Sequence, residues 1–211
     1  MMEFFASIFS LFSKGGLVMY PLLACSFVVV AIFIERCAYL SSARTDIAAL
    51  LPELAGKLAS GNWDEAARLC ATAKGTAAAM LAQCLGNPVH DRQQLEQMLE
   101  ASATRLVAKL RYRLNFLDTI VTLAPLLGLL GTVIGMIQSF SVLTIKAGQP
   151  LAITGGVGEA LVATAAGLCV AIIALVAHSY LTHRIEAIIA DMEEAANSVV
   201  TATVQGWQNE A

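Results

Sequence analysis

Charged residues are scarce in this sequence of 211 residues. They make up 14% of the chain, whereas hydrophobic residues make up 57% and the mean hydropathy is +0.70. A soluble domain carries about a quarter of charged residues. The imbalance therefore predicts an integral membrane protein with lipid around it. The net charge is −3, so nothing in the composition indicates a nucleic-acid partner.

Patterns that mark an enzyme or a metal site are also missing. The sequence contains no HExxH and no GxSxG, and no apolar run holds a pair of acids. The five cysteines show neither a CxxC pair nor a metal-ligand spacing, so we expect free thiols. The sequence thus predicts a protein that is not an enzyme and holds neither a metal nor another cofactor.

Three long apolar runs predict three membrane spans. Residues 17–34 carry no charge over 18 positions, which is near the length that crosses roughly 30 Å of hydrocarbon. Residues 1–16 fit either a short interfacial helix or the membrane-entering end of the first span. The expected segments are an N-terminal interfacial helix at 1–16, spans at 17–38, 119–143 and 159–182, a cytoplasmic helical region at 39–118, a periplasmic loop at 144–158 and a cytoplasmic C-terminal helix at 183–211.

The distribution of basic residues predicts the orientation. Of the thirteen Lys and Arg residues, only Lys14 and Lys146 fall in the N-terminal segment and the 144–158 loop. The other eleven lie between 35 and 118 or after the third span. Basic residues stay on the cytoplasmic side of a membrane. We therefore expect the N-terminus and the loop outside, and the other two segments inside.

The segments outside the spans read as helical. Asn62 and Asp91 are candidate N-caps. From Leu95 to Leu117 leucines recur at helical spacing with no breaker before Pro125, which predicts one long helix running into the second span. After the third span, Ile185, Ile188, Ile189, Met192, Ala196, Val199 and Val200 mark one apolar face. We expect the two long helices to pack on each other; a solvated amphipathic pair is the alternative.

Small residues are concentrated in the second and third spans. The second holds Gly128, Gly131 and Gly135, and the third holds Gly167 after a run of threonine and alanine. Small residues let helix backbones approach closely in lipid. Two interpretations stay open, namely tight packing within one subunit or an interior shared between subunits. Pro125 lacks an N–H, which frees a backbone carbonyl in the second span.

A few polar side chains accompany these small residues. Thr132 and Thr164 lie inside the spans, where a threonine hydroxyl can bond to a carbonyl three or four residues back. Glu159 either complements the dipole in the first turn of the third span or attracts cations at the outer mouth. His178 is a proton-exit candidate or an ordinary interfacial histidine. No span centre holds a carboxylate, so a titrating group on a proton path would come from another chain.

Two stretches carry a family resemblance. TLAPLLGLLGTVIGMIQSF at 122–140 and GEALVATAAGLCVAI at 158–172 resemble the paired signature of the MotA/TolQ/ExbB proton-channel family, in its ExbB/TolQ branch. GGLVMYPLLACSFVVVAIFIER at 15–36 is similar to its first span. The resemblance implies an all-α integral membrane protein with three spans, two of them extended into a cytoplasmic helical bundle. It also implies a homopentamer around a central pore in the bacterial inner membrane.

The resemblance further implies partners and roles. Two copies of an ExbD- or TolR-like single-span protein would fill the pore, and an aspartate on that partner would carry protons. The energy would pass to the cell envelope, and a TonB- or TolA-like protein would be a further partner in some systems. Thr132 and Thr164 would face the pore, and Glu159 would be the acid before the third span. The residues that would line the pore or contact the partner helix are Pro125, Gly128, Gly131, Gly135, Ala160 and Gly167.

The sequence departs from the family pattern in the third span. Relatives often read AIPA where this chain has Ala171, Ile172, Ile173 and Ala174, which predicts a straighter helix. His178 and Ser179 stand where a Tyr-Asn pair often follows. Two other functions stay open beside the proton-conducting subunit that the resemblance implies. They are a non-conducting membrane scaffold and a stator for gliding or motility. The client process, and the choice of proton or sodium, stay open.

Overall fold

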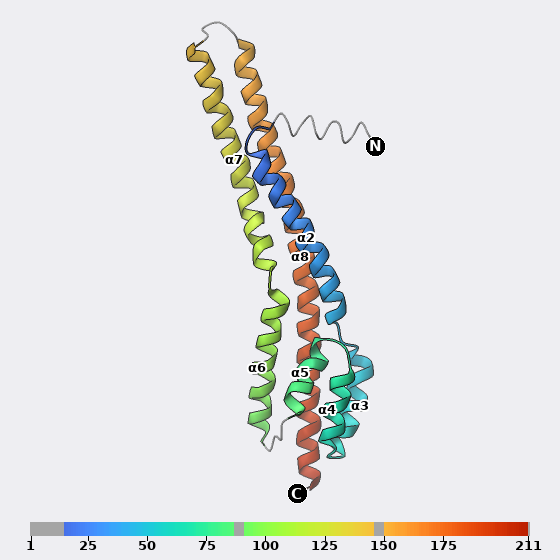
Figure 1. Ribbon diagram of the computed structural model, residues 1–211. Helices are drawn as coiled ribbons and strands as arrows, with labels where there is room; N and C mark the ends of the chain where they lie inside the picture. Colours follow the sequence, from blue (N-terminus) through green and yellow to red (C-terminus); the bar gives the residue numbers. More distant parts are fainter. Residues whose placement is uncertain (1–14, 87–90, 146–149, 211) are drawn as a thin grey trace, which may run out of the picture. The chain divides into compact units, whose positions relative to one another are not determined.

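The computed structural model describes residues 15–86, 91–145 and 150–210, and every regular element among them is an α-helix. This confirms the predicted all-α fold. Only residues 15 and 16 of the predicted interfacial helix at 1–16 lie within the described residues. The helices, labelled in Figure 1, are α2 (Met19–Ala43), α3 (Ile47–Ala59), α4 (Trp63–Thr72), α5 (Thr76–Leu85), α6 (Arg92–Arg111), α7 (Leu114–Ile145) and α8 (Pro150–Glu210).

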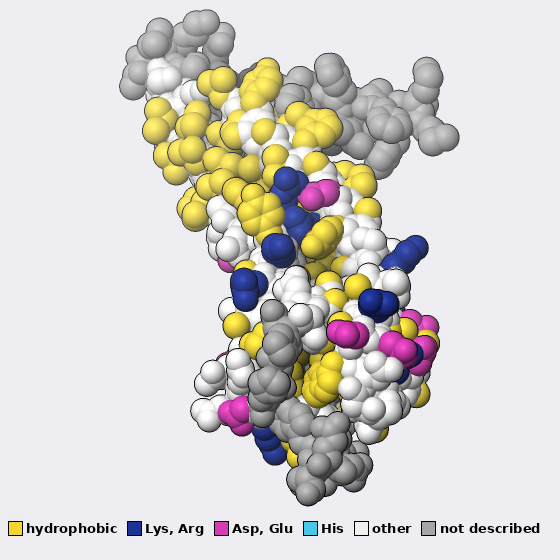
Figure 2. All heavy atoms as spheres, turned by 60° about the horizontal axis from the view of Figure 1, so that its bottom comes forward, with side chains coloured by type: hydrophobic (Ala, Val, Ile, Leu, Met, Phe, Trp, Pro, Cys, Tyr) yellow, Lys and Arg dark blue, Asp and Glu magenta, His cyan; other side chains and the backbone are white. Residues whose placement is uncertain are grey.

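The chain divides into two compact units. Unit 1 comprises Met1–Ile34 with Arg113–Tyr180, and unit 2 comprises Glu35–Tyr112 with Leu181–Ala211. Unit 1 therefore holds all of α7 and the first parts of α2 and α8. Three helices among the described residues are long and apolar enough to cross a membrane, as predicted. Large apolar side chains such as Phe27, Leu126 and Val176 are more than 60% exposed, which suits contact with lipid. Figure 2 shows hydrophobic side chains gathered over this unit.

Unit 2 is built around its own apolar core. Charged side chains gather over it in Figure 2, as expected for a part of the chain outside the membrane. Asn62 and Asp91 occupy the predicted N-cap positions of α4 and α6, although neither side chain makes a capping hydrogen bond. The fully buried large side chains of this core are Leu40, Leu54, Leu58, Met80, Leu81, Leu95, Leu110, Leu181, Ile185 and Met192.

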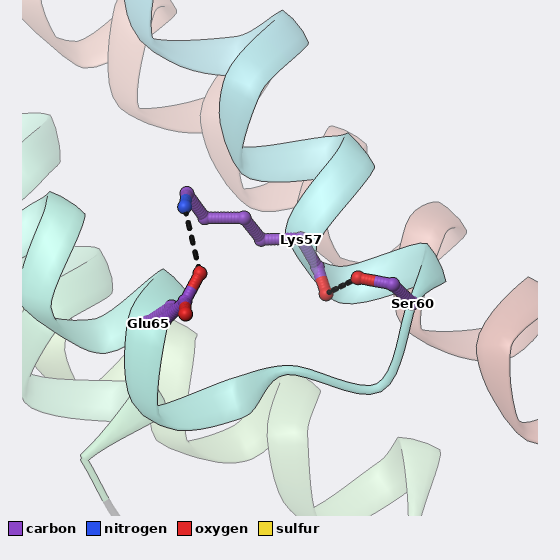
Figure 3. Close-up of polar contacts among 3 residues, drawn as sticks. All are labelled: Lys57, Ser60 and Glu65. Carbon is purple, nitrogen blue, oxygen red and sulfur yellow. Dashed lines mark hydrogen bonds and ion pairs between the residues drawn. The ribbon is translucent and has the colours of Figure 1, made fainter.

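An ion pair joins α3 to α4 on the surface of unit 2. Lys57 Nζ lies 2.9 Å from Glu65 Oε2, and Ser60 Oγ donates a hydrogen bond to the Lys57 carbonyl oxygen at 3.0 Å (Figure 3). The pairing raises the pKa of Lys57 and lowers the pKa of Glu65. Exposed pairs of this kind stabilise a fold little.

Thr45 holds the start of α5 from a distant part of the chain. Its Oγ1 accepts hydrogen bonds from the backbone N–H groups of Ala77, at 3.1 Å, and Ala78, at 3.4 Å. Gly75 precedes α5 with a φ of 106°, a conformation that glycine adopts without strain. A Cβ at Gly75 would overlap Thr45 and would lie 2.5 Å from the Arg44 carbonyl oxygen. The hydroxyl thus replaces a local N-cap.

Thr45→Val is expected to destabilise unit 2 by about 1–3 kcal/mol, because two buried amides lose their acceptor while the side-chain volume is kept. Thermal unfolding of the detergent-solubilised protein measures this loss. Thr45→Ser is the matched control, since it keeps the hydroxyl and should melt near the wild-type temperature. An equal melting temperature for the valine and serine variants would contradict the capping role.

The predicted long helix from Asp91 into the second span is wrong, because the chain breaks between α6 and α7. Tyr112 ends α6, and Arg113 has a φ of 71°, which non-glycine residues rarely adopt. Arg36, only 5% exposed, donates from Nη1 to the Lys109 carbonyl oxygen at 3.5 Å. Its guanidinium carbon lies 5.1 and 5.6 Å from the ring centroids of Tyr39 and Tyr112. A side chain distant in sequence thus supports the end of α6.

The apolar face of the C-terminal part of α8 is close to the prediction. Ile185, Ile188, Met192 and Val199 are buried as predicted, and Ala195 is buried in place of Ala196. Residues of α6 and α8, Leu99 and Met192 among them, line a shared groove of about 760 Å³. Helices α6 and α8 are therefore neighbours in unit 2, as predicted. A groove separates them over part of their length, whereas direct packing was expected.

The predicted loop at 144–158 is helical from Pro150 onward. Proline suits the first position of a helix, because its missing N–H would have had no partner there. Gly155, Gly156 and Gly158 of the predicted loop lie inside α8. A Cβ at Gly156 would lie 3.0 Å from the Gly135 carbonyl oxygen of α7, so this glycine permits a close helix contact.

Candidate functional site

Small residues of α7 and α8 form a tight contact in unit 1, here called the glycine seam. Its buried members include Gly128, Gly131 and Gly135 on α7 and Ala160, Ala163 and Gly167 on α8. Helices approach this closely only where side chains are absent or limited to a methyl group. The i+3 and i+4 spacing of the glycines places them on one face of α7.

The distances show why glycine is required at several of these positions. A Cβ would lie 2.5 Å from the Ala163 Cβ if added at Gly131, and 2.6 Å from the Ala124 carbonyl oxygen if added at Gly167. At Gly135 it would lie 2.9 Å from the Gly156 carbonyl oxygen. The structure therefore places the predicted glycines, with Ala160, in a contact within one subunit. Their contact with a partner helix stays a prediction.

Thr164 joins the two helices at the centre of the seam. Its Oγ1 lies 3.1 Å from the Gly128 carbonyl oxygen on α7 and 3.3 Å from the Ala160 carbonyl oxygen on its own helix. The single hydroxyl proton lies within reach of both carbonyl oxygens, so Thr164 links α8 to α7. Of the two predicted threonines, this one makes an interhelical hydrogen bond.

Thr132 lies on α7 and bonds only to its own helix. Its Oγ1 donates to the Leu129 carbonyl oxygen at 2.7 Å. Pro125 lies inside the same helix, and its missing N–H leaves the Val121 carbonyl without a helical partner. The two threonine hydroxyls therefore donate to different carbonyls, and the structure does not join them directly.

Glu159 lies against the turn that begins α2. Gly16 in that turn has a φ of 69°, and a Cβ added there would overlap the Glu159 carboxylate. The acid is half-buried. Since α8 begins at Pro150, Glu159 is not in its first turn, and the dipole of a helix acts mainly within the first turn. The dipole interpretation is therefore wrong, and a contact with Gly16 replaces it.

His178 is far from the threonines along α8. It follows Thr164 by fourteen residues, a rise of about 21 Å at 1.5 Å per residue. It is half-buried in unit 1. The structure therefore does not bring it next to Thr164, and its role as a proton exit stays a prediction.

Two polar features were missed from the sequence. Ser139 is 3% exposed and donates to the Gly135 carbonyl oxygen at 2.8 Å, within the seam. Asp118, Thr119 and Thr122 are exposed near the start of α7. The sequence could have indicated this second feature, because Asp118 and Thr122 are spaced at i and i+4. The predicted span began at 119, however, and so excluded the acid.

The cysteines take no part in this arrangement. The five are free. Burial raises the pKa of the Cys70 thiol in unit 2 to about 11, so this thiol stays protonated and unreactive at neutral pH.

These features define an all-α membrane protein with three long apolar helices, two of them joined by a seam of glycine and alanine that holds a threonine hydroxyl. The model of the MotA/TolQ/ExbB proton channel family matches residues 72–194. The chain belongs to this family, in its ExbB/TolQ-like branch, as the sequence signature predicted.

Curated relatives agree with the assignment. The chain is 36% identical over 169 residues to a putative biopolymer transport protein ExbB-like 3 of Synechocystis sp., covering 76% of this chain and 78% of the relative. It is 29% identical over 185 residues to a putative biopolymer transport protein ExbB homolog of Methanothermobacter thermautotrophicus, covering 87% and 66%. It is 36% identical over 94 residues to the Tol-Pal system protein TolQ of Haemophilus influenzae, covering 44% and 41%.

Proposed function

We propose that this chain is the ring-forming subunit of an ion-driven motor in the bacterial inner membrane. Five copies surround two copies of an ExbD- or TolR-like single-span partner. Protons move through the complex down the proton motive force, and the partner passes the energy to the envelope, in some systems through a TonB- or TolA-like protein. The family match and the relatives named ExbB and TolQ support this role. The family is a channel family and not an enzyme family.

The observation that carries the proposal is the glycine seam with its hydroxyl. In the seam Thr164 donates to the Gly128 carbonyl oxygen at 3.1 Å. A seam of this kind fixes α7 and α8 as one stiff wall with few side chains between them. The proposal assigns Thr132 and Thr164 to the wall facing the partner's aspartate, and Glu159 to the outer mouth, where an acid attracts cations.

The proposed orientation follows from the basic residues. Lys14 and Lys146 lie outside, and the segments rich in Lys and Arg lie in the cytoplasm. In this orientation the α7–α8 connection faces the periplasm, and unit 2 lies in the cytoplasm. Protons would then enter near Glu159, and His178, on the cytoplasmic side of α8, is the candidate for their exit.

A non-conducting scaffold is the second candidate. The hydroxyls of Thr132 and Thr164 already donate to backbone carbonyls at 2.7 and 3.1 Å. A threonine whose hydroxyl is already hydrogen-bonded to a backbone carbonyl can lie in a membrane helix without any role in ion transport. A scaffold would assemble as the motor does but would pass no protons.

Assembly and conduction separate the two candidates. Native mass spectrometry of the chain, expressed alone and beside a single-span partner, should show five copies joined by two copies of the partner. Proteoliposomes holding this complex and a pH-sensitive dye should acidify when a proton gradient is applied. A complex of the right size without flux would favour the scaffold, and a monomer or dimer would overturn the ring.

Thr164→Val is expected to leave the ring intact and to reduce proton flux at least about tenfold. Interhelical hydrogen bonds in membranes average about 0.6 kcal/mol, so the lost bond to Gly128 should not prevent assembly. The dye assay measures the flux. Thr201→Val is the control, because Thr201 bonds only to the Asn197 carbonyl oxygen of its own helix, at 2.9 Å, outside unit 1. Wild-type flux in the Thr164 variant would sink the hydroxyl path.

A further inference from the structure

A line of mostly polar side chains, exposed at its start and half-buried at Pro125 and Thr132, runs along the first half of α7. Asp118, Thr122, Pro125, Leu129 and Thr132 succeed one another at steps of four and three residues, so they lie on one face of the helix. Asn115 and Thr119 lie beside the start of this line. Asn115, Asp118, Thr119 and Thr122 are all exposed. We call the set formed by Asn115, Asp118, Thr119, Thr122, Pro125 and Thr132 the polar lane.

The lane is separate from the glycine seam. At about 100° per residue, Gly128 is turned roughly a quarter of a circle away from Asp118. A third face carries large exposed apolar side chains, with Phe116 at 58%, Leu123 at 40% and Leu130 at 47%. Therefore α7 has one face for α8, one apolar face suited to lipid, and one polar face that the chain itself leaves open.

Asp118 is the strongest indication that this open face meets water. Among the described residues its carboxylate has no hydrogen-bond or ion-pair partner. No acid lies in the first turn of α7, so its charge does not serve the helix dipole, which acts mainly within that turn. An unpaired charge is costly against lipid and is found facing the interior of a bundle or a water-filled cavity.

The neighbouring groups of the lane suit a file of water. Thr119 and Thr122 donate to the carbonyl oxygens of Asn115, at 2.8 Å, and Thr119, at 2.9 Å. Each hydroxyl keeps its lone pairs free to accept hydrogen bonds from water. Pro125 leaves the Val121 carbonyl without a helical partner. These acceptors continue the polar line from Asp118 toward Thr132.

We propose that the polar lane is the inner half of the ion path, a water file leading from Thr132 to Asp118. This inference rests on the proposed function and adds to it the route and the residue at its inner end. From Asp118 to Thr132 the chain advances by fourteen residues, or about 21 Å of helix. The negative charge of Asp118 lowers the energy of a proton carried by water as it leaves the file.

Labelling of single cysteines tests whether the lane holds water, without any need for conduction. In a background with the five native cysteines replaced by alanine, Thr122→Cys is compared with its neighbour Leu123→Cys. A small charged methanethiosulfonate reagent is added to the assembled complex. Thr122→Cys should react at least about tenfold faster, since thiolate chemistry needs water and access. Equal rates at the two positions would overturn the lane.

A charge series at Asp118 then tests its role in conduction. In the proteoliposome assay Asp118→Glu should conduct near the wild-type rate, and Asp118→Asn should conduct about tenfold less, because one charge at a mouth concentrates ions by about that factor. Asp118→Lys should lose more. Glu186→Gln, an exposed acid of unit 2, is the matched control and should conduct as the wild type. Native mass spectrometry verifies assembly of each variant.

The outcomes distinguish this inference from the function on which it rests. A conducting wild type with an Asp118→Asn variant that conducts equally overturns the lane and leaves the motor standing. A correctly assembled wild type that passes no protons overturns the proposed function, and with it any ion transport along the lane.

Discussion

Gly167→Val is expected to abolish the assembled protein, with the largest effect of any single substitution in unit 1. A Cβ at this position would lie 2.6 Å from the Ala124 carbonyl oxygen and 3.0 Å from the Gly128 Cα. These are backbone atoms, so no side chain can rotate to make room. Overpacking a well-packed contact costs about 1–3 kcal/mol and occasionally more, and here α7 and α8 would have to separate. Size-exclusion chromatography and thermal melting of the detergent-extracted protein measure the loss.

Gly158→Ala provides the matched control on the same helix. A Cβ added at Gly158 meets no atom within 4 Å. Alanine is favoured over glycine in a helix interior by about 0.8–1.0 kcal/mol, so this variant should melt at or above the wild-type temperature. Comparable melting of Gly167→Val and the wild type would contradict the close approach of the two helices.

Arg36→Ala is expected to have the largest effect in unit 2, a loss of about 3 kcal/mol. The substitution removes a hydrogen bond from a charged donor to the Lys109 carbonyl oxygen and two cation–π contacts, with Tyr39 and Tyr112. It also leaves a cavity beside the end of α6. Hydrogen exchange should accelerate at the amides from Leu110 to Leu114, because the turn that they form loses its support.

Two further variants separate the charge from the volume of Arg36. Arg36→Met fills much of the space and avoids the cost of burying a charge, so it should lose less stability than Arg36→Ala while still exposing the end of α6 to exchange. Arg105→Ala removes an exposed arginine of α6 and should change stability by no more than about 0.5 kcal/mol. Wild-type exchange in Arg36→Ala would show that another contact holds the break.

The sequence predicted the elements whose signals are local. Charge-free runs predicted the three long apolar helices, and Asn62 and Asp91 correctly marked the starts of α4 and α6. Both signals are local in the sequence. A charge-free run favours transfer of that segment into lipid, and an N-cap residue marks the first turn of the helix that follows it. The family signature likewise lies within two short stretches, and the family match confirms it.

The features that the sequence did not predict depend on distant contacts. The break after Tyr112 has no proline or glycine to mark it, because its support comes from Arg36, 73 residues away from the carbonyl that it contacts. The start of α5 depends on Thr45, 32 residues before the first amide that it caps. Residues 144–158 were predicted as a loop, although Gly156 lies in α8 and contacts Gly135.

The candidate site was predicted in composition but only partly in arrangement. Thr164 and the glycines were singled out from the sequence as a group, but periodicity alone could not tell which helix would fill their face. The structure shows that α8 of the same chain fills it. Asp118 was missed because the acid lies at the edge of the apolar run, where a boundary drawn by hydropathy excludes it.

The glycine seam also has a mechanical consequence. Where helices interdigitate through long side chains, a sideways load is absorbed first by rotation about side-chain bonds. Between α7 and α8 the contacts are made mainly by backbone atoms, methyl groups and the short side chains of Ser139 and Thr164, which have few such rotations to offer. The two helices therefore respond to a sideways load as one rigid unit. If a partner helix rotates against α7 and α8, its torque would act on both helices together, because no flexible side chains between them would absorb it.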